Sequence, residues 1–276
     1  MKIAILFHGH LRSFRNTKDS FNEKVLNSLS SFGFKQDPFI HTWDKEEFLT
    51  KTWHEGAKTA IPTSTDEVKK AYNPKGLSIE KQELKNTKDI FGRPYDSFKS
   101  YWYSLYQAFM LMKNYEEKNQ FKYDSIIVTR PDVQYFSNIF LSEIEKQDTL
   151  WQCQVYTKRA ASDVLFYGNR DTIEKSIVLF YENFDDLHSD KNVSKYVNNE
   201  YIFNDFISFN CNVRQSKYCM PRDWRILRSW WKPNHVVGHK KWDKNLCEQD
   251  IKSNNKYKFT GMTNNLYKTI FIHFSK

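Results

Sequence analysis

Arg130 and Asp132 stand two residues apart, and Thr129 separates them from a short apolar run, Ser125 to Val128. The run is rich in β-branched residues, which predicts a strand buried on both faces. Pro131 lacks a backbone donor, so we expect the strand to end near it. In an open α/β sheet, that end of a strand faces the ligand crevice. There a carboxylate can hold a divalent cation, and an arginine can bind a phosphate through two parallel hydrogen bonds.

Two interpretations of this pair remain open, because the motif alone favours neither. In the first, Arg130 and Asp132 bind a ligand. In the second, they form a structural pair that closes a turn. If Asp132 faces a crevice, it should matter more for turnover than for stability, and the fold should tolerate Asp132→Asn.

A wider pattern surrounds the pair. Lys122-Tyr123-Asp124, the apolar run and Thr129-Arg130-Pro131-Asp132 resemble a family of bacterial and large-virus glycosyltransferases that build surface polysaccharides and adopt the GT-A fold. Met1 to Phe14, Asp37 to Asp44 and Ser97 to Asn119 fit the same family. The resemblance therefore covers roughly the first half of the chain, and the order and spacing of the motifs carry it.

The resemblance implies a nucleotide diphosphate sugar as donor and a hydroxyl of a surface glycan or lipid-linked oligosaccharide as acceptor. In such families an Asp-x-Asp at the end of this strand binds a metal ion and the diphosphate. Here Arg130 replaces the first aspartate, so Asp132 is the remaining carboxylate. The implied assignments are Arg130 and Asp132 for the diphosphate, and Asp132 for a Mn²⁺ or Mg²⁺ ion.

Two further predicted strands end in polar residues. Lys2 to Phe7 precedes Gly9 and Arg12, which match a Gly-x-x-Arg that lies near the donor nucleotide in the family. A second strand, from Pro38, ends at Asp44, which is a candidate contact to ribose or base. A strand-end cap is an equally good interpretation of Asp44.

The clearest predicted helix runs from Ser97 to Asn119, with Ser97 as its N-cap. Its aromatic residues recur three or four positions apart, which predicts a face packed on the sheet. The resemblance implies that Tyr101, Ser104 and Gln107 face the donor. Ordinary polar positions at the flank of the helix would explain the same residues.

Sugar transfer from a diphosphate needs a base for the acceptor hydroxyl and positive charge at the leaving group. Asp163 enters a predicted strand that ends at Gly168, and similar enzymes place an acceptor-side Asp in such a segment. Glu200 lies near the start of a later predicted helix. Asp163 is the first candidate for the base and Glu200 the second, and a buried structural acid would explain either residue. Inverting and retaining transfer both remain open.

The 276 residues include 17% aromatics, enough for a substantial core. We expect an α/β fold, GT-A-like, with a Rossmann-type mixed sheet flanked by helices in one domain. Within it, 1–135 is the predicted nucleotide-sugar-binding half, 136–231 the acceptor half and 232–276 a basic aromatic tail. Four cysteines without metal-site spacing, and no signal-peptide pattern, predict a cytoplasmic protein with reduced thiols.

Charge is uneven along the chain. From Arg214 onward there are 14 Lys or Arg and 4 Asp or Glu, or +10, so the first 213 residues carry −1 of the net +9. This basic segment includes several tryptophans, Trp224 among them, and predicts peripheral contact with an anionic membrane surface. Two alternatives to a glycosyltransferase are another nucleotide-dependent transferase on an α/β sheet and a basic nucleic-acid-binding module. The nearly neutral net charge of the first 213 residues disfavours nucleic acid as a partner.

Overall fold

The computed structural model describes residues 1–47, 61–139, 141, 143–154, 163–189, 199–219 and 223–227. All of them belong to one compact unit, Met1–Trp230. The predicted tail, 232–276, lies outside the described residues. No helix in the described part of the chain combines the length and apolar character that a bilayer span requires.

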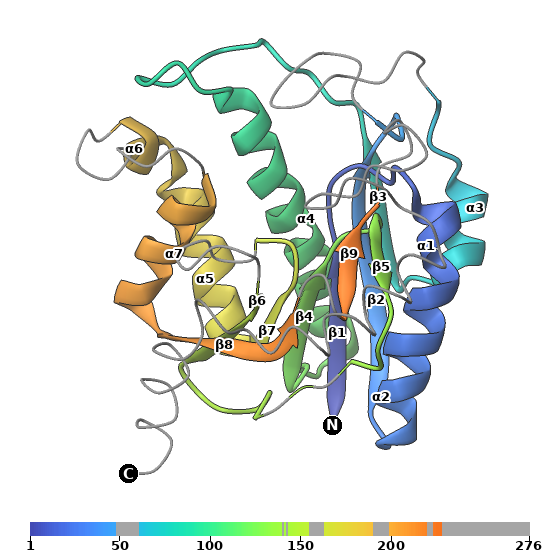
Figure 1. Cartoon of the computed structure of the whole chain (residues 1–276). Coiled ribbons are helices and arrows are strands. Elements are labelled where there is room, and N and C mark those ends of the chain that lie inside the picture. Colours follow the sequence, from blue (N-terminus) through green and yellow to red (C-terminus); the bar gives the residue numbers. More distant parts are fainter. Residues whose placement is uncertain are drawn as a thin grey trace, which may run out of the picture. The chain divides into compact units, whose positions relative to one another are not determined.

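A seven-stranded sheet forms the centre of this unit, in the order β3-β2-β1-β4-β7-β6-β8 (Figure 1). Strands β1 to β4 are mutually parallel where they pair, and β7 runs antiparallel to both of its neighbours. The predicted class, a mixed α/β sheet flanked by helices, is confirmed. The strands are β1 Lys2–Phe7, β2 Lys35–Trp43, β3 Gly76–Glu80, β4 Ser125–Thr129, β6 Thr149–Gln154, β7 Phe166–Asn169 and β8 Asn212–Cys219.

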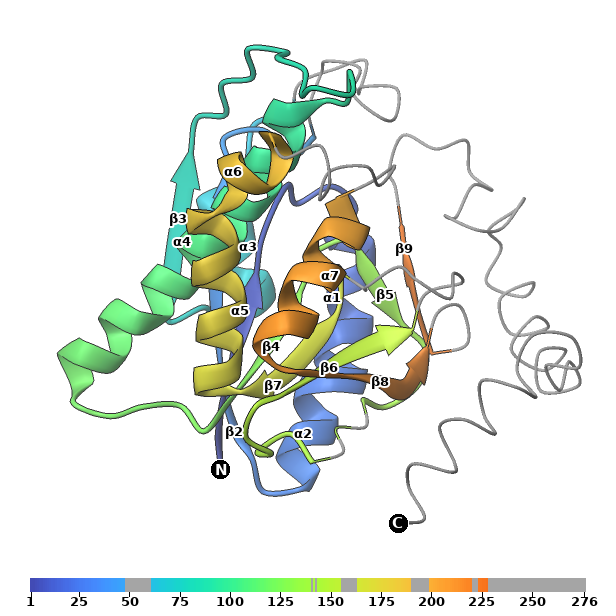
Figure 2. The same cartoon turned by 90° about the vertical axis from the view of Figure 1, so that its left-hand side faces the viewer.

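Helices cover both faces of the sheet (Figures 1 and 2). Successive side chains of β1 point to opposite faces of the sheet, so they pack against different helix layers. Ala4 and Leu6 join the core cluster beneath α4, whereas Phe7 contacts Phe21 and Tyr72 on the other face. The first layer holds α4 Tyr95–Asn119, α5 Arg170–Glu182 and α7 Asn199–Asn210, with the short α6 Phe184–Ser189 after α5. The second layer holds α1 Phe14–Phe21, α2 Asn27–Ser31 and α3 Thr65–Tyr72, and a π-helical stretch, η1 Asn22–Leu26, joins α1 to α2.

Helix α4 begins two residues before the predicted N-cap. Pro94 occupies the N-cap position, so Ser97 lies inside the helix and that detail of the prediction is wrong. The backbone N–H of Tyr95 donates to the carbonyl of Thr87, which fixes the start of the helix. The predicted aromatic face is confirmed, because Trp102 is fully buried and its ring lies 4.4 Å from that of Phe203.

A second, two-stranded sheet pairs β5 Val133–Tyr135 with β9 Trp224–Ile226, antiparallel. Directly after β9, the backbone N–H of Leu227 donates to the carbonyl of Asp132 at 2.7 Å. This sheet therefore holds the turn that follows β4. Trp224 is fully buried in it, so this member of the predicted membrane-contacting set does not reach a lipid surface.

Candidate active site

Two loops leave the same edge of the sheet side by side. Strands β1 and β4 are parallel neighbours, with Phe7 opposite Thr129 at their carboxyl ends. The chain moves from β1 to β2 on one side, and β4 lies on the other, so the strand order reverses here. Such a reversal is where open α/β sheets form ligand crevices. The structure thus brings the polar residues after Phe7 next to those after Thr129.

Asp132 is the centre of this junction. Its Oδ1 accepts from Nε of Arg130 at 3.0 Å, and its Oδ2 accepts from Nη2 of Arg130 at 2.6 Å. The same Oδ2 also accepts from Nη1 of Arg12 at 3.1 Å. The Asp132 side chain is fully buried, so the expectation that it faces the crevice is wrong. It is held between two arginines, and its removal would take the carboxylate partner from Arg130 and one of two carboxylate partners from Arg12.

The loop after β1 is shaped by two residues with positive φ. Gly9 has φ +82° with no atom within 4 Å of a Cβ placed there, so the backbone conformation, not crowding, favours glycine. Its N–H donates to Oγ of Ser104 at 2.7 Å, which ties the loop to α4. Arg12 has φ +50°, and its Nε donates to both carboxylate oxygens of Glu47. Asp132 and Glu47 together fix the guanidinium of Arg12.

A small cavity of about 60 Å³ opens at this edge. It is lined by three of the predicted donor-binding residues and by side chains from β2, α4 and the segment after β3: Gly9, Arg12, Arg130, Trp43, Gln82 and Tyr101. Nε and Nη2 of Arg130 bind Asp132, while its Nη1 makes no hydrogen bond to the described residues. Within the described part of the chain, this leaves Nη1 of Arg130 without a hydrogen-bond acceptor beside the cavity.

Tyr101 connects Asp163 to the arginines. Its hydroxyl donates to the backbone carbonyl of Asp163 at 2.5 Å, and its ring centroid lies 6.0 Å from the Arg130 guanidinium carbon. Burial lowers the pKa of Arg130, but the charges of Asp132 and Asp163 and the hydrogen bonds to Asp132 raise it above its ordinary value, so the guanidinium stays charged. The first-choice base thus lies within electrostatic reach of the predicted diphosphate site.

Two histidines of the β1 loop are neutral near pH 7. Burial, and next the charge of Arg130, hold the pKa of His8 well below its ordinary value. Both ring nitrogens of His8 are buried without a hydrogen-bond partner in the described part of the chain, and its ring packs on that of Tyr101. Burial lowers the pKa of His10 to about 4, and the His10 ring is held by the Lys45 carbonyl and Gln82.

The other predicted residues lie apart from the cavity lining. Asp44 is half-buried at the end of β2, and its Oδ1 accepts from the backbone N–H of Gln82, which positions Gln82 at the cavity. Gln107 is half-buried on α4 but does not line this cavity. Glu200 is the second residue of α7, which confirms the helix predicted there.

The donor set at Asp132 does not fit a divalent cation. Such a cation needs several oxygen ligands with free lone pairs. Both oxygens of Asp132 are already directed at arginine N–H groups. The described residues also contain no cluster of three or more His, Cys, Asp or Glu side chains arranged to hold a metal.

Sequence reasoning missed Glu47 and Gln82 as parts of the site. Both lie in the polar, lysine-rich stretch between β2 and α4, where no periodicity marks a residue as special. Their roles follow from partners far away in the sequence: Glu47 binds Arg12, and Gln82 binds His10.

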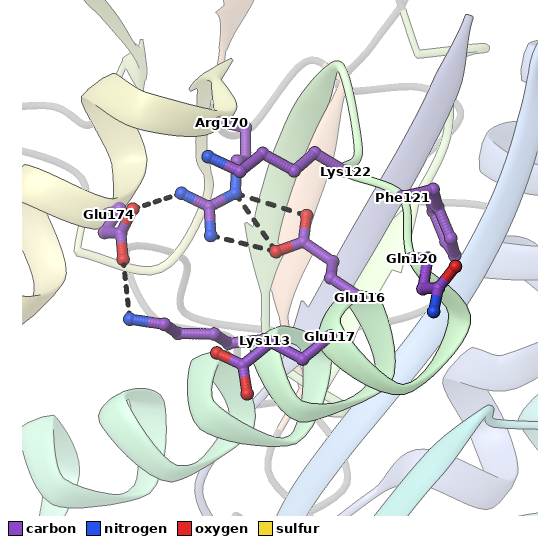
Figure 3. A pocket seen from close by; sticks show the side chains of 8 residues that line it. All are labelled: Lys113, Glu116, Glu117, Gln120, Phe121, Lys122, Arg170 and Glu174. Carbon is purple, nitrogen blue, oxygen red and sulfur yellow. Dashed lines mark hydrogen bonds and ion pairs between the residues drawn. The ribbon is translucent and has the colours of Figure 1, made fainter.

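A second, larger cavity of about 590 Å³ lies where the end of α4, the segment that leads from it toward β4 and the start of α5 meet (Figure 3). Its lining is dominated by ion pairs. Arg170 donates to both oxygens of Glu116, and Glu174 binds both Arg170 and Lys113. Because these charges satisfy one another, we interpret this network as a brace between α4 and α5 and not as the candidate active site.

Comparison with known proteins does not place the chain in a family. No protein-family description matches the chain, and no curated protein does. Among solved structures, a glycosyltransferase involved in the glycosylation of the major capsid of PBCV-1 is similar at a TM-score of 0.40 and 9% identity, over 78% of this chain and 81% of its own. A nucleoside-diphosphate-sugar pyrophosphorylase from Vibrio cholerae RC9 has a TM-score of 0.38 and 12% identity, over 81% and 94%. Similarity this low assigns no function.

Proposed function

We propose that the protein is a glycosyltransferase that moves a sugar from a nucleotide diphosphate sugar to a hydroxyl of a surface glycan or lipid-linked oligosaccharide. The observation that carries the proposal is the meeting of Arg12 and Arg130 at the cavity where the strand order reverses. The resemblance of the segments around these two arginines to a glycosyltransferase family supports the same assignment.

In this proposal the arginines bind the diphosphate. Arg130 offers Nη1 to a phosphate oxygen while Asp132 keeps its guanidinium plane in place. Charge-assisted bonds from arginine to phosphate are short and directional, so they fix the leaving group as well as neutralise it. Gly9 and Trp43 line the same cavity and are available to the rest of the nucleotide.

We assign the role of general base in the transfer step to Asp163. The acceptor hydroxyl oxygen forms a bond to the anomeric carbon of the donor while the bond from that carbon to the diphosphate oxygen breaks. The hydroxyl proton passes to the Asp163 carboxylate, and the electron pair leaves with the nucleoside diphosphate. Arg12 and Arg130 stabilise the negative charge that develops there. Glu200 is the alternative base.

A divalent cation at Asp132 stays an untested prediction, and the pairing of Asp132 with two arginines argues that guanidinium groups supply the positive charge. Membrane contact by the basic segment from Arg214 onward and a cytoplasmic location are likewise predictions that rest on the sequence.

A thermal-shift screen with UDP, GDP, CMP, S-adenosylmethionine and a short oligonucleotide tests the proposal. We expect one nucleoside diphosphate to raise the melting temperature and the other compounds to leave it unchanged. Stabilisation by S-adenosylmethionine or by the oligonucleotide alone would contradict the proposal and favour one of the alternative classes.

A further inference from the structure

A hairpin between β3 and α4 presents two neighbouring apolar side chains to solvent. Ile90 and Phe91 are each 50% exposed at its tip. The segment that carries them passes beyond the carboxyl ends of the strands before α4 begins (Figures 1 and 2). Large apolar residues exposed singly are ordinary, but an adjacent pair on a projecting tip is a candidate contact surface.

The hairpin is built mainly from polar interactions, and the contact between them and the apolar pair is the Arg93 guanidinium carbon, which lies 5.3 Å from the centroid of the Phe91 ring. Asp89 forms an ion pair with Arg93 at 2.5 Å, and both side chains are buried. The carboxylate of Asp89 also accepts from the backbone N–H groups of Phe91 and Arg93. Gly92, with φ +76°, allows the reversal of the chain. The apolar tip is therefore not needed to fill a core within the hairpin.

The base of the hairpin is equally well fixed. Asp96, in the first turn of α4, accepts from the backbone N–H and the hydroxyl of Thr87. The backbone of Tyr95 pairs with that of Thr87. Because its conformation is set before any contact is made, the tip can be buried elsewhere with little further loss of conformational entropy.

The flank of the tip is basic. Lys85 and Lys88 are exposed and form no ion pair with the described residues. The acid nearest the tip, Asp89, is neutralised by Arg93. An apolar tip flanked by lysines that have no ion pair within the described ranges matches the two layers of an anionic bilayer surface, with charged headgroups outside and hydrocarbon beneath.

We propose that the tip Ile90-Phe91 and its flanking residues Lys85 and Lys88 form a docking point for an anionic lipid surface. These residues are not part of the basic segment from Arg214 onward for which the sequence predicts membrane contact. Gln82 and Leu84 of the same segment line the candidate active-site cavity, so docking at the tip would place that cavity close to the lipid. The inference does not depend on the proposed sugar transfer.

Co-sedimentation of the full chain with vesicles tests this inference. One vesicle contains phosphatidylcholine alone, and the other contains phosphatidylcholine and phosphatidylglycerol in equal amounts. We expect binding to the anionic vesicles that weakens with salt, and an affinity at least roughly tenfold lower for the double variant Ile90→Ser, Phe91→Ser. Lys85→Gln with Lys88→Gln should lower the affinity and flatten its salt dependence.

Phe32→Ser is the matched control, because Phe32 is 64% exposed but lies directly after α2, apart from the hairpin. It should bind vesicles like the wild type, and circular dichroism should show that all variants are folded. Wild-type affinity in the Ile90→Ser, Phe91→Ser variant would overturn the inference, as would equal or no binding to the two vesicles. A wild-type dimer that this variant converts to a monomer would identify a second copy of the chain as the partner instead.

Discussion

Replacement of Asp132 by asparagine should destabilise the fold strongly. The side chain is fully buried, and its two oxygens receive hydrogen bonds from Arg130 at 3.0 and 2.6 Å and from Arg12 at 3.1 Å. Asparagine keeps one acceptor oxygen but removes the charge, so the buried Arg130 loses its ion-pair partner while Arg12 keeps Glu47. Breaking a buried ion pair on one side costs about 3–5 kcal/mol. That is a large part of an unfolding free energy of about 5–15 kcal/mol.

Urea denaturation followed by circular dichroism measures this loss. Asp148→Asn is the control, since Asp148 binds Lys175 at 3.5 Å and both side chains are more than half exposed. An exposed pair of this kind is worth at most about 1 kcal/mol. If Asp132→Asn lowers the unfolding free energy no more than the control does, Asp132 is not the anion that holds the two arginines.

Three further outcomes follow from the described contacts. Glu116→Gln should lower the unfolding free energy in urea denaturation by about 3–5 kcal/mol, because it leaves the buried Arg170 without its main partner. Glu117 is the exposed neighbour, and Glu117→Gln should change the unfolding free energy by less than about 0.5 kcal/mol. Acid should destabilise the protein through His10, whose pKa is about 4 when folded and 6.5 when unfolded. The unfolded state binds more protons between these values, so stability is complete above pH 6.5 and falls toward pH 4, by about 3 kcal/mol for this residue. A His10→Gln variant with an unchanged pH profile would contradict that origin. Asp163→Asn should abolish sugar transfer but leave nucleotide affinity unchanged in calorimetry, and full transfer activity would exclude Asp163 as the base.

Local pattern was enough to predict the elements that build the sheet edge. The run Ser125 to Val128 lies in β4, Ser125–Thr129, as predicted. A continuous stretch of β-branched apolar residues is typical of a strand that is buried on both faces of a sheet. The aromatic spacing in α4 predicted its buried face, although the hairpin before it, and not Ser97, sets where the helix begins. Gly9 and Arg12 were correctly placed near Arg130, since parallel strands end at one edge.

The burial of Asp132 could not be predicted in the same way. It depends on Arg12, which is 120 positions away in the sequence, and on the positive φ that directs the Arg12 backbone. Both interpretations of the Arg130–Asp132 pair hold in part: the two residues form a structural pair, and Arg130 also lines the cavity. From the sequence these two interpretations are alternatives, because the contact between Arg12 and Asp132 cannot be predicted from residues so far apart.

Calorimetric titration of UDP and GDP into the wild type and into Arg130→Lys tests the central claim most directly. Lysine keeps the positive charge beside Asp132 but loses the planar fork, so a phosphate bond worth about 1.5–3 kcal/mol should be lost. We predict that one nucleotide binds the wild type and binds Arg130→Lys at least about tenfold more weakly. Arg15→Lys, which changes an arginine that binds Glu46 and Glu67 outside the cavity lining, should keep the wild-type affinity. Equal affinity of Arg130→Lys and the wild type, or no binding of either nucleotide to the wild type, would contradict the claim that a nucleoside diphosphate binds at this edge of the sheet.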